Sequence, residues 1–137
     1  MKQVMITGSA IAGLLLCASA AAAGTPPALF TAAQASAGAT AFAQNCASCH
    51  GADLKGGAGP ALIGQGFAAA GSGATVGSIF TTMAEQMPSS SPGSLSQTQY
   101  EDIMAYVLQQ NGYPAGSTAL VYKDSLTSTV PLVSQVK

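Results

Sequence analysis

The run Cys46-Ala47-Ser48-Cys49-His50 constrains this chain more than any other part of its sequence. Two thiols three residues apart, followed at once by an imidazole, form the pattern for covalent attachment of a c-type haem. Each thiol can add to one vinyl group of the porphyrin, and the adjacent histidine lies where its ring can reach the iron. The motif therefore predicts one haem c as cofactor, redox chemistry and an oxidising compartment.

The first 23 residues have the pattern of a cleaved secretory signal peptide. Lys2 supplies a positive start, residues 4–17 are apolar and uncharged, and alanines 20–23 offer cleavage sites that would leave Gly24 first. A retained membrane anchor and a lipoprotein attached at Cys17 are the alternatives. The apolar run is short for a membrane span, and Leu16 is larger than the residue that usually precedes a lipoprotein cysteine. We expect a periplasmic or secreted protein with no membrane span after cleavage.

Charge and cysteine content exclude several classes of protein. After cleavage the chain keeps three lysines, no arginine and five acidic residues, a formal charge of −2. Such a chain has no basic patch for nucleic acid or for an anionic membrane. Cys46 and Cys49 are the only cysteines left, so no disulfide framework is available.

Three helices are expected, at 31–47, 75–86 and 97–110, where apolar residues recur at helical spacing. The segment 51–73 is rich in glycine and is expected to be a loop. The loop nevertheless contains four large apolar residues, which a solvent-exposed linker would lack: Leu54, Leu62, Ile63 and Phe67. It is therefore expected to wrap an apolar group. Residues 113–137 could form short elements or lie over the body of the protein.

His50 is the only histidine of the chain, so it is the one imidazole available as proximal iron ligand. Met87 is the expected sixth ligand, because it ends a helix and precedes Pro88, where fixed irregular backbone can aim the thioether. Met83, one turn earlier, is the second candidate. Met104 lies on the apolar stripe of the last helix and is expected to be core filler. A thioether ligand opposite histidine raises the reduction potential.

A haem-ligating histidine usually donates its second N–H to a fixed acceptor. Pro60, ten residues beyond His50, could hold such a carbonyl, or could be a plain turn proline. Two other interpretations of the cysteine pair were weighed. A thioredoxin-like redox pair needs a βαβ setting, which the sequence lacks, and a zinc site needs four ligands where Cys46, Cys49 and His50 offer three.

The chain resembles the class I c-type cytochromes over about residues 31–112. Besides the haem motif, the resemblance rests on Gly38 and Phe42, on the segment 59–62, on Met87-Pro88 and on Tyr106. It implies an all-α, loop-rich fold of three to five helices around one covalent haem. It also implies that the first and last helices cross where Gly38 and Phe42 meet Tyr106.

The resemblance also implies site roles. Cys46 and Cys49 would attach the haem, His50 and Met87 would bind its iron, Pro60 would hold His50, and Leu62 would pack on the haem face. The stretch 100–116, which ends Asn-Gly-Tyr-Pro-Ala-Gly, is similar to monohaem cytochromes associated with periplasmic dehydrogenases, including quinoprotein types. The lysine ring with which mitochondrial members dock is absent, so partners would bind through apolar and hydrogen-bonding contacts.

The expected organisation is a signal peptide at 1–23, a cytochrome c domain at 24–116 and a C-terminal extension at 117–137, which could cover the haem or dock a partner. The expected function is single-electron transfer in the periplasm, without catalysis of a bond-making reaction. Expected partners are a dehydrogenase as donor and an oxidase or another cytochrome as acceptor. A haem subunit of a periplasmic dehydrogenase is the alternative function, followed by an open-site haem enzyme or gas sensor.

Overall fold

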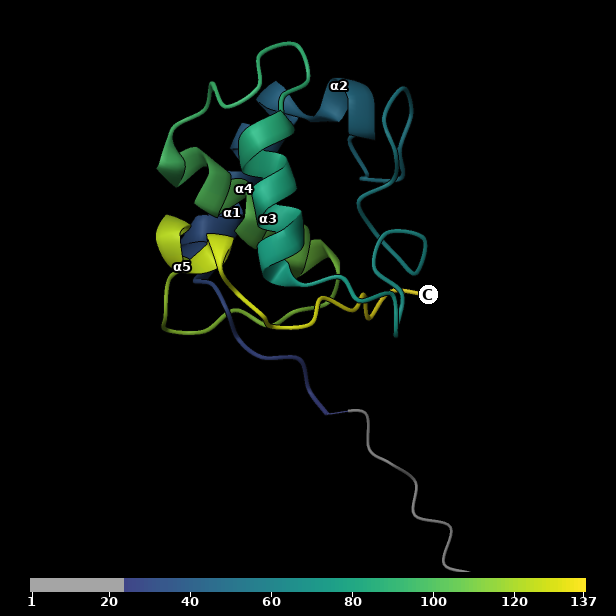
Figure 1. The fold of residues 1–137 in the computed structure, drawn as a ribbon, viewed down its shortest axis with the longest axis vertical. Helices are drawn as coiled ribbons and strands as arrows, with labels where there is room; N and C mark the ends of the chain where they lie inside the picture. The colour runs from purple at the N-terminus through teal and green to yellow at the C-terminus, as the bar shows by residue number, and fades with distance from the viewer. Residues whose placement is uncertain (1–23) are drawn as a thin grey trace, which may run out of the picture.

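A computed structural model describes residues 24–137, and the expected signal peptide lies outside the described residues. The described chain folds into helices joined by long loops (Figure 1). The helices are α1 (Ala32–Asn45), α2 (Ala47–His50), α3 (Val76–Gln86), α4 (Gln97–Gln110) and α5 (Tyr122–Leu126). Residues 24–137 contain two isolated β-bridges and no strand. The predicted all-α fold is therefore confirmed.

The expected helix at 31–47 ends two residues early. The backbone leaves helical geometry at Cys46, with φ −126° and ψ −33°, and the haem motif then forms the separate turn α2. The other two predicted helices match α3 and α4 to within one residue. Each of the three helices also begins with a capping box, which is closed by the side chains of Thr31, Thr75 and Ser96.

Helices α1 and α4 pack directly against each other, as the resemblance implied. A Cβ atom at Gly38 would overlap the backbone carbonyl of Asp102 and lie 2.9 Å from the Cβ of Tyr106. The rings of Phe42 and Tyr106 meet one turn along, with their centroids 5.4 Å apart. Glycine is unfavourable inside a helix, and here it permits a backbone approach that no other residue allows.

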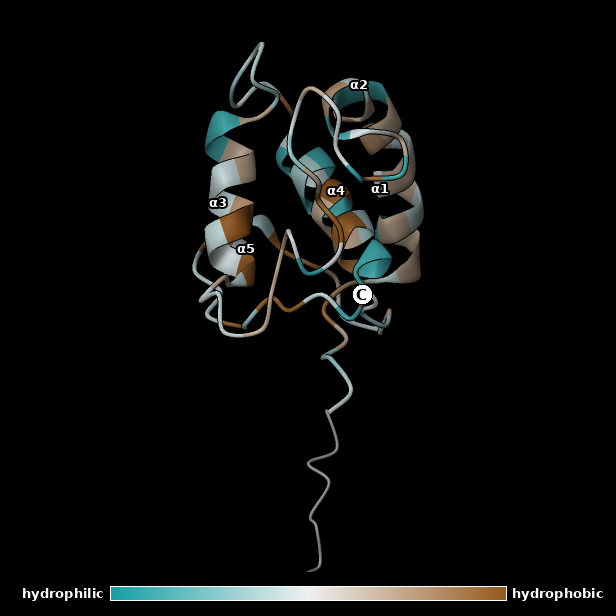
Figure 2. Ribbon diagram, turned by 90° about the vertical axis from the view of Figure 1, so that its right-hand side faces the viewer, coloured by the Kyte–Doolittle hydropathy of each residue, from teal (hydrophilic) through white to brown (hydrophobic). Residues whose placement is uncertain are grey.

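Two apolar clusters fill the interior, and in Figure 2 the apolar parts of α3 and α4 face it. The larger cluster joins α3, α4 and the C-terminal segment through Phe80, Met104 and Leu132. The smaller one joins α1 to the glycine-rich loop through Phe42 and Leu54. No helix within residues 24–137 is long and apolar enough to cross a membrane.

The C-terminal segment 117–137 lies over the body of the protein rather than over a haem pocket. Its backbone pairs with the chain before and within α3, since Val76 N–H donates to Val130 and Leu132 N–H donates to Ala74, both at 2.9 Å. Ser134 N–H donates to the carbonyl of Ala68 at 2.8 Å. These bonds hold the segment against α3 and the loop before it, and none of its residues lines the cavity between α2, α3 and α4.

Candidate functional site

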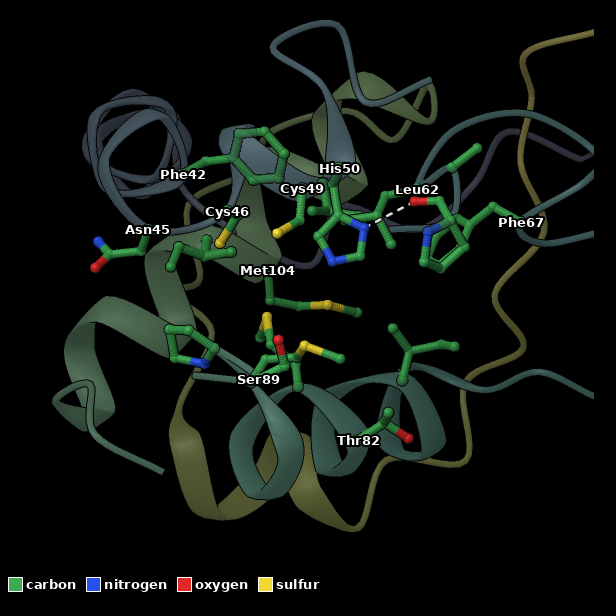
Figure 3. Close-up of a pocket in the computed structure, with 18 of the residues that line it drawn as sticks. Phe42, Asn45, Cys46, Cys49, His50, Leu62, Phe67, Thr82, Ser89 and Met104 are labelled. Carbon is green, nitrogen blue, oxygen red and sulfur yellow. Dashed lines mark hydrogen bonds between the residues drawn. The ribbon is translucent and has the colours of Figure 1, made fainter. Parts of the chain in front are cut away.

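A cavity of about 390 Å³ opens between α2, α3, α4 and the glycine-rich loop. Figure 3 shows Cys46, Cys49 and His50 on one side of it, with Thr82 and Ser89 on the other. Its walls are mainly apolar and aromatic, with contributions from Phe42, Leu62, Phe67, Ile79, Ile103 and Val107. A mostly apolar cavity with a few convergent ligating groups is the usual form of a cofactor site.

His50 is oriented by one hydrogen bond. Its Nδ1 lies 2.7 Å from the carbonyl oxygen of Pro60. A carbonyl can only accept, so Nδ1 is the donor, and in the neutral imidazole the lone pair then lies on Nε2. This is the arrangement in which a histidine binds a metal through one nitrogen while the other fixes its orientation. The sequence left two interpretations of Pro60 open, an acceptor for His50 or a plain turn proline, and the observed contact is the first.

The loop after His50 comes very close to the imidazole. A Cβ at Gly59 would lie 3.0 Å from Cε1 and 3.1 Å from Nδ1 of His50, closer than side chains normally pack. The loop is pinned by Gly59 N–H, which donates to Cys49 at 2.8 Å, and by Leu62 N–H, which donates to Leu54 at 2.7 Å. The small residue at 59 therefore lets Pro60 place its carbonyl against the ring.

Both thiols of the motif are free in the structure and line the same cavity as His50. The side chain of Cys46 is partly buried, and that of Cys49 is exposed. Burial, with a smaller contribution from the neighbouring Cys49, raises the pKa of the Cys46 thiol to about 11. Cys46 N–H continues the α1 pattern by donating to Phe42, while His50 N–H donates to Cys46. One helical turn thus presents two thiols and one imidazole to the cavity.

Three methionines line the cavity: Met83, Met87 and Met104. Met104 is fully buried in the larger cluster, as its place on the α4 stripe predicted. Met83 is half-buried and packs against both clusters. Met87 is the C-cap of α3 and, among residues 24–137, belongs to neither cluster. Its thioether is therefore the one that the protein core does not already use.

The glycine-rich loop uses only part of its apolar content to line the cavity. Leu62 and Phe67 line it, as the sequence suggested. Leu54 is 1% exposed and belongs to the smaller cluster, against which the half-buried Ile63 also packs, and neither residue lines the cavity. Leu54 has a positive φ of 61°, in a turn where its N–H donates to the carbonyl of Gly51 at 3.1 Å. The sequence shows that this loop carries apolar residues, but only the folded loop shows which of them line the cavity.

Asn111 is a positioning residue that sequence reasoning missed. In the sequence it directly follows the expected helix at 97–110, yet its side chain is completely buried. Its Nδ2 donates to the carbonyls of Leu62 and Val107, at 2.9 and 2.8 Å, and its Oδ1 accepts from Gly64 N–H at 3.1 Å. These bonds fasten the loop that carries Leu62 to the end of α4. An asparagine before glycine is a common helix end, so no sequence signal distinguishes it.

The residues around the cavity fit a covalent haem in both chemistry and placement. Two thiols, an imidazole with a free nitrogen, a thioether outside the core and an apolar wall face one space. The family model described as "Cytochrome C oxidase, cbb3-type, subunit III" matches residues 33–107, more than half of the chain. The chain belongs to the class I c-type cytochromes.

One solved structure gives an independent comparison for this cytochrome. It is the crystal structure of the sulfane dehydrogenase SoxCD from Paracoccus pantotrophus, with 26% sequence identity and a TM-score of 0.54. The match covers 71% of this cytochrome and 53% of the SoxCD chain, so the cytochrome spans about half the length of its neighbour. Among curated proteins, no relative matches it.

Family membership decides between the interpretations of the cysteine pair. The cofactor of this cytochrome is a covalently bound haem c, rather than zinc or a dithiol couple. Its function is electron transfer. The roles of the individual residues stay predictions.

Proposed function

We propose that this cytochrome is a periplasmic or secreted single-electron carrier whose haem is bonded to Cys46 and Cys49, with His50 and Met87 as iron ligands. When bound, the haem iron supplies the chemistry by alternating between its ferrous and ferric states. The observation that carries the proposal is the cavity at which His50, both thiols and the methionines converge. We assign the cytochrome domain to 24–116 and a C-terminal extension to 117–137.

In this proposal the polypeptide holds the residues that bind the haem iron in place and does not react with a substrate. Pro60 keeps the unprotonated Nε2 of His50 available by accepting from Nδ1, and a hydrogen-bonded imidazole is also a more basic ligand. Leu62 and Phe67 exclude water from the cavity wall. An apolar surrounding and a thioether both favour the reduced state of the metal, so we expect a raised potential.

Met87 is proposed as the sixth ligand because its backbone is fixed while its side chain is not used in the core. Its N–H donates to the carbonyl of Met83 at 3.1 Å and closes α3, and Pro88 follows directly. Met83 and Met104 contribute to the apolar clusters, where a ligating role would remove packing.

Replacing Met87 with alanine tests this assignment. The near-infrared band from sulfur-to-iron charge transfer in the oxidised protein should disappear, and the reduction potential should fall by on the order of a tenth of a volt. Carbon monoxide should then bind the ferrous form readily, because the sixth position is open. Optical spectra and redox titration measure these effects.

Met83→Leu is the matched control, because it removes a thioether from the same helix and the same cavity. It should keep the charge-transfer band and resist carbon monoxide as the native protein does. If the band survives Met87→Ala and is lost in Met83→Leu, Met83 is the ligand. Ready carbon monoxide binding by the native protein would instead favour an open-site enzyme or gas sensor.

Electron exchange should depend little on ionic strength, because no Asp, Glu, Lys or Arg of residues 24–137 lines the cavity. Lys55 is the lysine closest in sequence to the haem motif. Its ammonium lies 3.6 Å from the Asp53 carboxylate, so the two charges largely cancel. We expect the oxidation rate by ferricyanide, an anion, to change by less than about twofold between low and physiological salt. Stopped-flow measurements with ferricyanide and with the cation tris(phenanthroline)cobalt test this. Strong salt effects of opposite sign would contradict an uncharged rim.

A haem subunit of a periplasmic dehydrogenase is the second candidate. The likeness to the SoxCD structure supports it, since that protein is a dehydrogenase. Redox partners would then include a catalytic subunit as electron donor. Co-purification with a large subunit from the native source favours this role, whereas a monomer that exchanges electrons freely favours the carrier.

A further inference from the structure

Tyr100 lies in the first turns of α4, and its hydroxyl contacts the backbone of the proposed ligand. The hydroxyl donates to the carbonyl oxygen of Met87 at 2.7 Å, the usual length of a strong O–H···O bond. The hydroxyl oxygen of Tyr100 in turn accepts from Leu95 N–H at 3.5 Å. One side chain thus joins the beginning of the segment 87–95 to its end.

The ring of Tyr100 has little freedom to move. The residue is 2% exposed and belongs to the larger apolar cluster. Its ring centroid lies 6.4 Å from that of Tyr122 in α5, which in turn meets Phe80 of α3 edge-to-face at 5.3 Å. A rigid aromatic group therefore supports the hydroxyl, and its position is set by three helices.

Other bonds to this segment are weaker or local. The Met87 carbonyl also accepts from Gly93 N–H at 3.3 Å, a contact inside the segment itself. Ser91 N–H donates to Pro88 at 2.8 Å, again within the segment. Among the described residues, the hydroxyl of Tyr100 is the side-chain group that ties Met87 to the helical core.

We propose that Tyr100 is a positioning residue, which holds the Met87 backbone so that the thioether stays directed at the haem iron. The inference rests on the proposed ligand role of Met87. Because Met87 lies outside the apolar clusters, packing alone does not fix its side chain. Without the hydroxyl, the carbonyl of Met87 and the N–H of Leu95 both lose a partner, and the segment can move away from the cavity.

The test is Tyr100→Phe in the haem-loaded protein, a change that keeps the ring and its aromatic contacts. The iron–thioether bond should weaken, so the charge-transfer band should lose intensity and the reduction potential should fall. The affinity of the ferrous form for carbon monoxide should rise about tenfold, the size expected from loss of one buried hydrogen bond.

Tyr113→Phe is the matched control. Tyr113 is similarly buried, and its hydroxyl donates to the carbonyl of Pro131 at 3.2 Å and accepts from Val133 N–H at 2.9 Å. The Tyr113→Phe substitution therefore removes a tyrosine hydroxyl that binds two backbone groups of the C-terminal segment, neither of them in the segment 87–95. Both variants should melt at similar temperatures, but only Tyr100→Phe should change the band, the potential and carbon monoxide binding.

The outcomes separate the two proposals. If Met87→Ala abolishes the band while Tyr100→Phe matches the native protein, Met87 is the ligand and the positioning role is wrong. Equal changes in Tyr100→Phe and Tyr113→Phe would also overturn it, because they would reflect lost stability alone. If the band survives Met87→Ala, the ligand assignment itself fails, and the role of Tyr100 fails with it.

Discussion

Replacing Gly38 with alanine should destabilise this cytochrome by about 3 kcal/mol or more. In an exposed helix the same change would stabilise by roughly 1 kcal/mol, because alanine is the better helix former. Here the new methyl group would overlap the carbonyl of Asp102, which belongs to the backbone of α4 and cannot turn aside. The helices must separate, and the overlap outweighs the gain in propensity.

Thermal unfolding of the haem-loaded protein measures the effect of Gly38→Ala, with an expected fall in Tm of at least about 10 °C. Separation of α1 from α4 should also weaken the contact between Phe42 and Tyr106. Ala37→Ser is the control, since it also adds one heavy atom to α1, but on the exposed face. A Gly38→Ala protein as stable as Ala37→Ser would show that the two helices can part without cost.

Removing both thiols should abolish covalent attachment. In a Cys46→Ser, Cys49→Ser protein, haem should dissociate on denaturation, because only coordination and apolar contacts remain to hold it. A covalent tether also keeps the effective haem concentration high, so the untethered protein should lose haem under native conditions as well. Its cavity would then expose an apolar wall to water, and the protein should unfold at a lower temperature.

Mass spectrometry and haem staining after denaturing electrophoresis measure attachment directly. The native protein should carry the mass of one haem. The single variants Cys46→Ser and Cys49→Ser should each keep that haem through one remaining thioether bond, and the double variant should carry no covalent haem. Ser48→Ala, between the two cysteines, should leave the haem mass unchanged. Covalent haem in the double variant, or its absence in the native protein, would contradict the proposed roles of Cys46 and Cys49.

The sequence predicted the parts of the protein whose signals are local. Helices α3 and α4 begin at capping residues and carry regular apolar stripes, so both were found within one residue. The haem motif is read in five consecutive residues, and family membership confirms its cofactor. The α1–α4 crossing could be anticipated from the resemblance because only glycine at position 38 allows it.

Contacts between distant segments could not be read in this way. The break at Cys46, the burial of Leu54 away from the cavity and the bonds of Asn111 depend on how loops close in three dimensions. In the sequence, Tyr100 is only one residue of the expected helix at 97–110. Its hydroxyl gains a role from meeting a carbonyl thirteen residues earlier in the chain.

By itself, the sequence determined the cofactor, the helical class and the candidate ligands, because covalent attachment and helix formation depend on neighbouring residues. The tertiary structure alone decided which methionine stays outside the core and which carbonyl faces His50 at 2.7 Å. It also decided that the C-terminal segment packs on α3 rather than over the cavity. Those choices depend on packing and hydrogen bonding between segments that the chain order keeps apart.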